Sequence, residues 1–491
     1  MQKCMAAVAI AALLPAVASA ESLRDAIALA YETNPVLRSQ RAAQRAVDEE
    51  YEQAMAGYRP TVSISGQIGY QYADLDQQSF VGGYTTSHQQ ADTGQVDLSL
   101  VQPLYTGGAV WARVNSASAD ILAGRESLRR TEGQLLLQVV TAYMDVQRDR
   151  ETLEILAQET SDLQADYTEV QAQGALGQVT RTDVAQAEGR LLNVQVQIEQ
   201  ARAKLGASQS TYLDLVGQSP GALESEPDLK NVPATVDQAF DVAEASNPQL
   251  RGAIQTELAA RSKVSEAKAA SAPNLSFRID GAIAPIAPYI PREYDRSVTA
   301  GISYSQNFYT GGYNGSKIRE AIERDNKAAL DIESTRRDVV QSISQAWDLY
   351  RSAKRSLDLQ QSLLKSEALA LQGEQVEHRA GLRTTIDLLN AELELSTAKL
   401  GFVQSRHDAY VASASLLNAM GLLEVRFLYK DLALYRPEAS MQRRARNNAM
   451  PLDGVAGWLD KINAPAAPAP ISSSLSAGGR RPSGEAIPDG H

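Results

Sequence analysis

The stretch VQPLYTGGAV at residues 101–110 closely resembles a second stretch, SQNFYTGGYN, at residues 305–314. Both contain the tetrapeptide Tyr-Thr-Gly-Gly, whose glycines are Gly107, Gly108, Gly311 and Gly312. Hydrophobic residues alternate along the chain before each tetrapeptide and follow helical spacing after it. We therefore expect a junction where a strand ends and a helix begins, because glycine adopts backbone angles that neither element supplies.

The junction belongs to a longer repeat. Asn34-Pro35 recurs as Asn247-Pro248, and the pattern Gly-x-x-Thr-x-x-Asp occurs at residues 177–183 and again at 381–387. A complete structural unit therefore occurs twice. The expected organisation is a first repeat at 21–217, a linker at 218–234, a second repeat at 235–430, and a largely disordered tail at 431–491 that is rich in Pro, Ala and Ser.

Before each junction, at about 61–104 and 275–308, the pattern has a period of two. Val62 and Ile64 alternate with Ser63 and Ser65, for example. This alternation predicts one antiparallel hairpin per repeat, with strands of about 10–12 residues and polar loops at about 76–91 and 285–297. An apolar face opposite a polar face is typical of a membrane barrel wall. The alternative is a soluble sandwich in which the apolar faces pack on one another.

After each junction the hydrophobic spacing becomes seven, as in Val139, Val146 and Leu153, and it continues beyond the first Gly-x-x-Thr-x-x-Asp turn, as in Leu191 and Ile198. No proline occurs between residues 104 and 219. The pattern predicts a helix from Gly108 to about residue 175, on the order of 100 Å long, with coiled-coil packing against its neighbours. Shorter helices are expected at 22–33, 35–58, 178–216, 235–246 and 248–271. Because four strands cannot close a water-filled barrel, several identical chains must share one.

Composition and isolated residues exclude several classes of protein. The net charge of −12 argues against a nucleic-acid partner. Residues Met1–Ala20 resemble a secretory signal peptide with an Ala18-Ser19-Ala20 cleavage site, and the single cysteine, Cys4, lies inside it. We therefore expect no disulfide, no lipid anchor and no cysteine-bound metal in the mature chain. The four histidines are scattered and no catalytic motif occurs, so we expect no enzymatic activity, no cofactor and no metal site.

The signal peptide, the twofold repeat, the Asn-Pro pairs, the QPLY-x-GG junction and the G-x-x-T-x-x-D turns together resemble the TolC family of outer membrane factors over about residues 21–430. The resemblance implies a mainly α-helical fold with a small β part. Long coiled-coil helical hairpins form an α-barrel, and four strands per chain form a third of a 12-strand transmembrane β-barrel in a homotrimer.

The same resemblance implies the function. The chain is expected in the outer membrane with its helical part in the periplasm, exporting proteins, small molecules such as drugs, or both. Its expected partners are a periplasmic adaptor (membrane fusion) protein and an inner-membrane transporter. The residues themselves leave one alternative, a periplasmic coiled-coil scaffold or adaptor protein without a membrane barrel.

The two helical tips, at about 174–183 and 378–387, carry the G-x-x-T-x-x-D pattern. A glycine suits the left-handed position at the end of a helix, and a threonine followed three residues later by an acid suits the start of the next helix. The residues predicted to form these turns and caps are Gly177, Thr180, Asp183, Gly381, Thr384 and Asp387.

The resemblance to the TolC family further implies a gate, in which the second tip closes the periplasmic entrance. Asp387 then supplies one carboxylate per chain to a ring, and a second acidic ring would fall where this sequence has Asn390. The positions that match the closing links are Thr182, Asp183, His378 and Arg383. His378 stands where the family has tyrosine. One hypothesis is that His378 makes closure sensitive to pH, and the alternative is a solvated histidine at the tip.

Overall fold

The computed structural model describes residues 21–79, 82–227, 229, 231–285, 294–429, 434–438, 453–462 and 464. The expected signal peptide, residues 286–293 of the second predicted loop, and most of the tail lie outside the described residues. The chain divides into two units. The first comprises Met1–Ala42, Ser127–Pro248 and Arg337–Tyr435, and the second comprises Ala43–Glu126, Gln249–Arg336 and Arg436–His491.

The helices repeat in the two halves of the chain, as the sequence predicts. Their bounds are α1 Leu23–Thr33, α2 Pro35–Met55, the 3-10 helix η1 Ala56–Tyr58, α3 Ala109–Ala175, α4 Arg181–Val216, α5 Val236–Ser246, α6 Pro248–Ala269, α7 Tyr313–Arg379, α8 Thr385–Met420, α9 Val425–Leu428 and α11 Asp453–Ile462. Helices α3 and α7 have 67 residues each, so each rises on the order of 100 Å. In the described part of the chain, no helix combines the length and the apolar character needed to cross a membrane.

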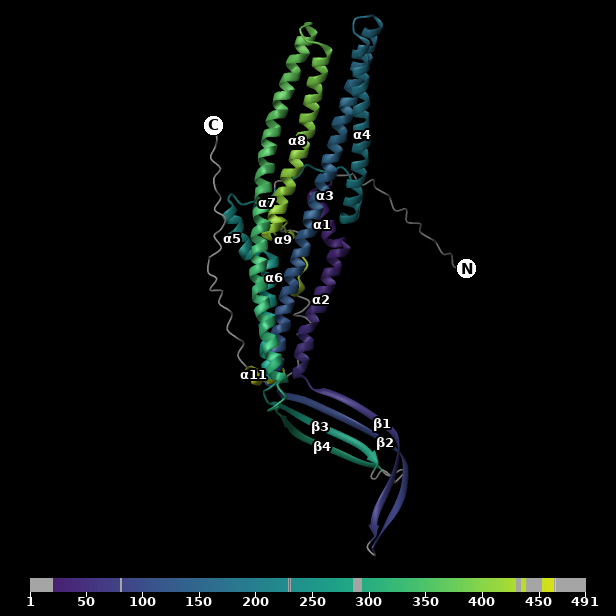
Figure 1. Ribbon diagram of the computed structural model, residues 1–491, viewed down its shortest axis with the longest axis vertical. Helices are drawn as coiled ribbons and strands as arrows, with labels where there is room; N and C mark the ends of the chain where they lie inside the picture. Colours follow the sequence, from purple (N-terminus) through teal and green to yellow (C-terminus); the bar gives the residue numbers. More distant parts are fainter. Residues whose placement is uncertain are drawn as a thin grey trace, which may run out of the picture. The chain divides into compact units, whose positions relative to one another are not determined.

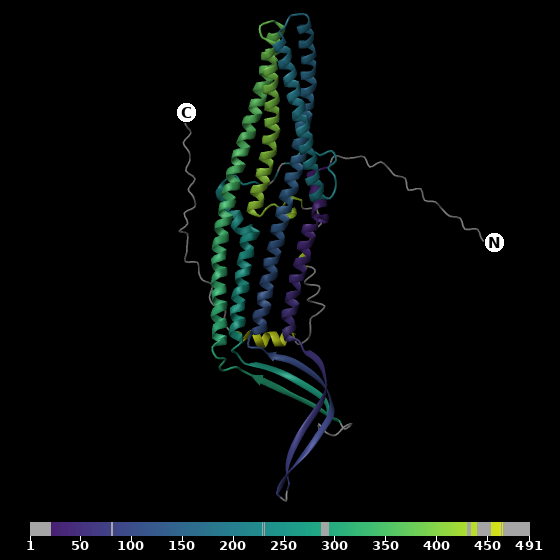
Figure 2. The ribbon, with the colours of Figure 1, turned by 45° about the vertical axis from the view of Figure 1, so that its right-hand side comes forward.

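In the first unit, α3 runs beside α4 and α7 beside α8, so that the helices form two hairpins (Figure 1, Figure 2). A buried cluster joins the hairpins, because it contains residues of α3, α4 and α8. Its buried members are Leu156, Leu163, Leu191, Val194, Ile198, Ala201 and Leu389. Leu191 and Ile198 belong to the predicted seven-residue spacing, which therefore marks the packed seam.

The two Asn-Pro pairs separate α1 from α2 and α5 from α6. The amide nitrogen Nδ2 of Asn34 donates to the carbonyl oxygen of Leu215, 3.0 Å away, and Asn247 Nδ2 donates to the carbonyl oxygen of Ala419, 2.8 Å away. The last carbonyl groups of a helix have no amide donor within the helix. Asn34 supplies such a donor at the end of α4, and Asn247 supplies one at the end of α8. The break between two short helices therefore recurs in both repeats, at the positions that the sequence predicts.

The second unit contains an antiparallel sheet with the strand order β1-β2-β3-β4. The strands are β1 Thr61–Ser79, β2 Gly83–Tyr105, β3 Asn274–Pro285 and β4 Tyr294–Ser305. Ile64 pairs with Leu98, which in turn pairs with Gly281, while Ser63 pairs with Ser99 and Ser99 with Asp280. Because directly paired residues share a face, one face is apolar and the other polar, as the alternation predicts.

Among the residues that the structure describes, none covers the apolar face of this sheet. Ile64 is 75% exposed, Ile68 92% and Val298 79%. A sandwich would have buried these residues against a second sheet. The soluble-sandwich alternative is therefore wrong for this chain.

The first hairpin is longer than the sequence predicts. Strands β1 and β2 have 19 and 23 residues, and their pairing continues from Thr61↔Val101 to Ser79↔Gly83. The predicted loop at 76–91 is therefore wrong, since most of it is strand. Backbone hydrogen bonds extend a ladder through polar residues as well as apolar ones, so the loss of apolar alternation did not mark the strand end. Strands β3 and β4 have 12 residues each, within the predicted range of about 10–12.

Within the tail that the sequence predicts to be largely disordered, Asp453–Ile462 form helix α11, which the sequence analysis did not predict. The segment DGVAGWLDKI places Val455, Trp458, Leu459 and Ile462 at helical spacing between two Pro-rich stretches. The overall composition of the tail concealed this short amphipathic pattern. Within the second unit, α11 packs against η1 and the end of β2.

Candidate functional site

The two helical tips end and restart their helices in the same way. Gly177 and Gly381 have φ angles of 75° and 74°, in the left-handed region. The amide of Gln178 then donates to the Gln173 carbonyl oxygen at 2.9 Å, and that of Leu382 to the Glu377 carbonyl oxygen at 2.9 Å. These bonds satisfy carbonyls at the ends of α3 and α7, so the glycines terminate both helices.

Threonine and aspartate cap the following helices. Thr180 Oγ1 accepts from the Asp183 amide at 3.3 Å, and Asp183 Oδ2 accepts from the Thr180 amide at 2.8 Å. Thr384 and Asp387 repeat these contacts at 3.3 and 3.0 Å. Hydrogen bonds from the Thr384 hydroxyl and amide hold the pKa of the exposed Asp387 carboxyl below its usual range. Asp387 thus stays ionised over a wide pH range.

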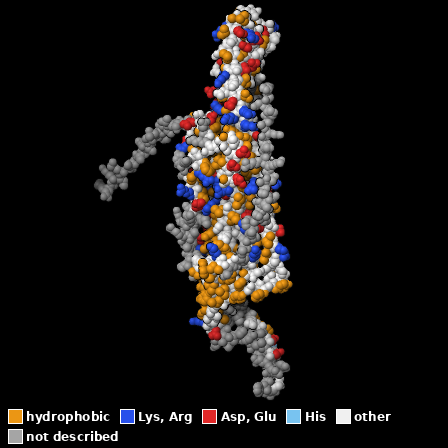
Figure 3. Space-filling view, turned by 90° about the vertical axis from the view of Figure 1, so that its left-hand side faces the viewer, with side chains coloured by type: hydrophobic (Ala, Val, Ile, Leu, Met, Phe, Trp, Pro, Cys, Tyr) orange, Lys and Arg blue, Asp and Glu red, His pale blue; other side chains and the backbone are white. Residues whose placement is uncertain are grey.

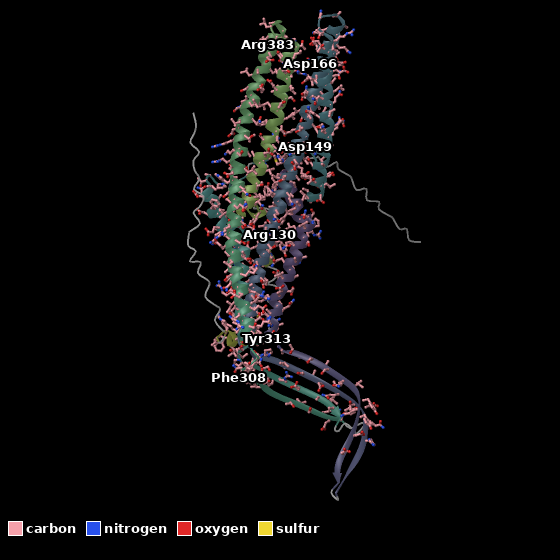
Figure 4. The ribbon with its side chains drawn as sticks, in the orientation of Figure 1. Arg130, Asp149, Asp166, Phe308, Tyr313 and Arg383 are labelled. Carbon is pink, nitrogen blue, oxygen red and sulfur yellow. The ribbon has the colours of Figure 1, made fainter. Side chains whose placement is uncertain are left out.

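Three of the four residues matched to the closing links, Asp183, His378 and Arg383, line a cavity of about 460 Å³ between the two tips. Gly177, Thr180, Asp183, His378, Arg383 and Thr384 are among its lining residues. Arg383 Nε pairs with Glu377 Oε2 of its own hairpin at 2.8 Å, not with Asp183 of the other tip. The turn that holds Arg383 lies at the end of the α7–α8 hairpin (Figure 4). Thr182 is exposed in the first turn of α4.

A direct contact between the hairpins involves a residue that the sequence analysis did not single out. Arg190 Nη2 of α4 donates to Asn390 Oδ1 of α8 at 2.7 Å. Asn390 occupies the position of the expected second acidic ring. Because an amide oxygen accepts this bond, Asn390 joins the two copies of the repeat at the place where a carboxylate was expected.

Farther along the same seam, two carboxyl groups face each other from different hairpins. Asp166 lies on α3 toward its tip end (Figure 4), and Glu392 lies on α8. One oxygen of each, Asp166 Oδ2 and Glu392 Oε2, is buried without a hydrogen-bond donor. Burial, followed by the charge of Asp166, raises the pKa of Glu392 to about 8. Burial also raises the pKa of Asp166. The pair therefore retains a proton near neutral pH.

The first strand-to-helix junction is closed by Asp460 of α11. Gly107 and Gly108, with φ angles of 67° and 85°, link β2 to α3. Asp460 Oδ1 accepts from the amides of Thr106 and Gly108 at 2.8 and 3.2 Å, and Asp460 Oδ2 accepts from the Thr106 hydroxyl at 2.6 Å. Asp460 is 1% exposed. Its charge thus satisfies amides at the N-terminal end of α3.

The second junction has the same backbone but other partners. Gly311 and Gly312 have φ angles of 61° and 85°. Thr310 Oγ1 accepts from the Asn314 amide at 3.2 Å, and Asn314 Nδ2 donates to Ser271 Oγ at 3.1 Å. Phe308 and Tyr313 flank this junction (Figure 4), and both side chains are largely exposed.

One protein-family model matches the chain twice, once in each copy of the repeat. The model described as "Outer membrane efflux protein" matches residues 26–218 and again residues 220–422. The chain belongs to the outer membrane efflux protein family. Outer membrane efflux protein BepC of Brucella suis is 30% identical over 421 residues, which cover 86% of this chain and 90% of that protein. Outer membrane protein TolC of Escherichia coli is 22% identical over 474 residues, 93% of each chain.

The solved outer membrane channel CmeC of Campylobacter jejuni has the same fold, with a TM-score of 0.70 at 12% identity, covering 87% of this chain and 90% of that one. The resemblance to the TolC family is thus confirmed. This outer membrane efflux protein is an export channel of the outer membrane, and the alternative of a periplasmic scaffold or adaptor is set aside. Its family is one of transport channels rather than of enzymes.

Proposed function

We propose that three copies of this chain form one channel, in which 12 strands close a barrel in the outer membrane and the long helices line a periplasmic tunnel. A periplasmic adaptor protein and an inner-membrane transporter deliver the exported protein or small molecule to that tunnel. The observation that carries this proposal is the four-stranded sheet with one exposed apolar face.

The strand order supports the sharing of one barrel. In the described sheet, β1 and β4 are the edge strands, each hydrogen-bonded to one neighbour. Unpaired backbone groups are not tolerated in lipid, so each edge needs a strand from another chain. Pairing of β4 with β1 of the next copy satisfies both edges by one kind of contact, which a closed ring of identical chains repeats.

Cysteine cross-linking tests this arrangement without interference from native thiols, because the single native cysteine is Cys4. One cysteine replaces Ser63, Ser65 or Gln67 on the polar face of β1, and another replaces Ser297 or Thr299 on β4. We expect one of these combinations to give a covalent trimer on a non-reducing gel. Exclusively monomeric bands from membrane-inserted, ion-conducting material in every combination contradict the shared barrel. A pair of cysteines on β1 alone is the matched control.

We also propose that the second tip, at about 378–387, forms the gate at the tunnel entrance. Both cap bonds of Asp387 end on the same oxygen, Oδ2, and the lowered pKa keeps the carboxylate charged. In a trimer, three such carboxylates around a constriction favour cations. His378, Arg383, Asn390 and the first-tip residues Thr182 and Asp183 contribute the surroundings that close or release this tip.

Matched amide substitutions test the gate. Asp387→Asn keeps an acceptor for the cap but removes the charge, so we expect the preference for cations over anions in planar lipid bilayers to fall several-fold. Asp183→Asn makes the same change in the first tip, outside the proposed ring, and should change ion selectivity much less than Asp387→Asn. Equal selectivity of Asp387→Asn and the wild type, with both forming channels, places the constriction elsewhere.

A further inference from the structure

Helix α11 has an unusual distribution of polar and apolar side chains. Its carboxylate Asp460 is buried at 1% exposure. Val455, Trp458, Leu459 and Ile462 follow the spacing i, i+3, i+4 and i+7 and so form one stripe. Trp458 is 61% exposed, and Val455 and Ile462 are 57% and 58% exposed. A helix whose outer face meets water normally buries such a stripe and exposes its charge.

The register of the sheet places the two strand-to-helix junctions at one level. Tyr105, at the end of β2, pairs with Leu275, which pairs with Tyr304 near the end of β4. The two strand-to-helix junctions therefore lie at the same level of the sheet. Asp460 holds α11 at the first junction, and at the second Phe308 and Tyr309 are 87% and 88% exposed.

The apolar stripe of α11 thus lies at the level of the sheet where strands become helices. On the side drawn in Figure 3, hydrophobic side chains gather where the strands meet the helices. Aromatic side chains are typical of the boundary between lipid and water. Lys461, whose ammonium lies 5.4 Å from the centre of the Trp111 ring, adds a cation that suits phospholipid headgroups.

We propose that α11 is an interfacial helix that inserts Val455, Trp458, Leu459 and Ile462 into the phospholipid leaflet on the periplasmic side of the outer membrane. The helix has ten residues, too few to span a bilayer but enough to lie in its surface. Asp460 fastens the helix to the barrel end of α3. The C-terminal segment therefore anchors the rim of the channel in the membrane, through lipid contact in addition to the strands.

Trp458 itself supplies the test, since the chain has three tryptophans and Trp111 and Trp347 are replaceable by Phe. The full channel, containing Trp458 alone, is inserted into phosphatidylcholine vesicles whose acyl chains are brominated near the headgroup. We expect the brominated lipid to remove a large part of the Trp458 emission, while aqueous iodide removes little. A channel containing Trp347 alone, in the helical region of the first unit, is the matched control and should lose no emission to brominated lipid.

Two results overturn the proposal. Emission that iodide quenches and brominated lipid does not places the stripe in water. Emission that neither quencher reaches places it against protein, such as a second copy of the chain. Ion conductance in planar bilayers confirms that each variant has assembled, so failure of the anchor is distinguishable from failure of the channel.

A nitroxide at Ile462→Cys gives an independent measurement that keeps Trp111 in place. We expect this label to be more accessible to molecular oxygen, which concentrates in lipid, than to a water-soluble nickel complex. The reverse order of accessibility contradicts insertion.

Discussion

The first junction, Thr106–Gly108, is buried beneath Asp460, whereas the second, Thr310–Gly312, leaves both glycines exposed. Their sequences are nearly the same and so are their backbone angles, because glycine at positive φ determines the local turn in both. The surroundings differ because the chain has two repeats but one α11. Duplication thus reproduced the local turn, while the segment after the repeats made one copy different from the other.

The two junctions are held by different hydrogen-bond partners. At the first, three backbone amides, those of Thr106, Gly108 and Trp111, direct hydrogen bonds to one carboxylate. At the second, the Thr310 hydroxyl accepts from the Asn314 amide, and the Asn314 side chain donates to the Ala270 carbonyl oxygen, with no hydrogen bond to α11 among the described residues. A change at the first junction should therefore disturb α3 and α11 together, and the equivalent change at the second should remain local.

The largest expected effect comes from Asp460→Ala. The substitution leaves buried amides without an acceptor, and we expect a local loss of about 3 kcal/mol. Hydrogen exchange at Thr106, Gly108 and Trp111 should then be roughly 100-fold faster, because 1.4 kcal/mol corresponds to a factor of ten. Lys461→Ala on the same helix removes one cation–π contact and should change these rates little. Unchanged exchange in Asp460→Ala contradicts the role of α11 as a cap.

A smaller effect distinguishes the two junctions through matched glycine substitutions. A Cβ at Gly107 would lie 2.5 Å from the Ala272 Cβ and 3.1 Å from the Ala269 carbonyl oxygen, but at Gly311 it would meet nothing within 4 Å. Both substitutions strain a left-handed backbone. Gly107→Ala adds overlap, so we expect it to lower the free energy of unfolding by about 2 kcal/mol more than Gly311→Ala.

Thermal unfolding of the helices, followed by circular dichroism in detergent, measures that difference. The two variants share the chemical change and the positive φ, so each is the other's control. Equal midpoints for both variants indicate that the first junction tolerates the added methyl group by moving Ala272.

The sequence alone predicted those features that repeat or that follow a period. The alternation of residues such as Val62 and Ser63 predicted the faces of the sheet, the seven-residue spacing through Leu191 predicted the packed seam, and Thr180 and Thr384 predicted their caps. These signals are local, because each depends on neighbours within about two helical turns or one pleat.

Contacts between distant segments were not predicted. Asp460 contacts Thr106, 354 residues away in the sequence, and Arg190 contacts Asn390, 200 residues away. The sequence around a single carboxylate or guanidinium group does not indicate which distant residue it will contact. The glycine pairs of both repeats also have the same preceding residues, Tyr-Thr, although tertiary packing buries Gly107 and leaves Gly311 exposed. The repeat therefore predicts equivalent backbones but cannot predict which copy the tail contacts.

The smallest expected effect concerns a contact that joins the two copies, the carboxyl pair of Asp166 and Glu392. The negative charges of Asp162 and Glu169 on α3 also raise the pKa of Asp166, and that of Asp162 raises the pKa of Glu392. The positive charge of Arg190 on α4 acts in the other direction and lowers the pKa of Glu392. Because the pKa of Glu392 in the folded state, about 8, exceeds its value in the unfolded chain, folding favours the protonated form. This contribution is complete below the unfolded pKa near 4.5 and is lost as the pH rises through about 8.

We therefore expect the free energy of unfolding of the wild type to fall by ~1–2 kcal/mol between pH 5 and pH 9, allowing for partial solvent screening. Glu392→Gln should flatten this dependence, because an amide can donate to an ionised Asp166 at every pH. Glu394→Gln, an exposed neighbour on α8, should keep the wild-type slope. Denaturant unfolding at several pH values measures all three, and parallel curves for the wild type and Glu392→Gln contradict a shared proton. If the slope disappears in Glu392→Gln alone, the two copies of the repeat are held together by a proton at a contact that neither copy contains by itself.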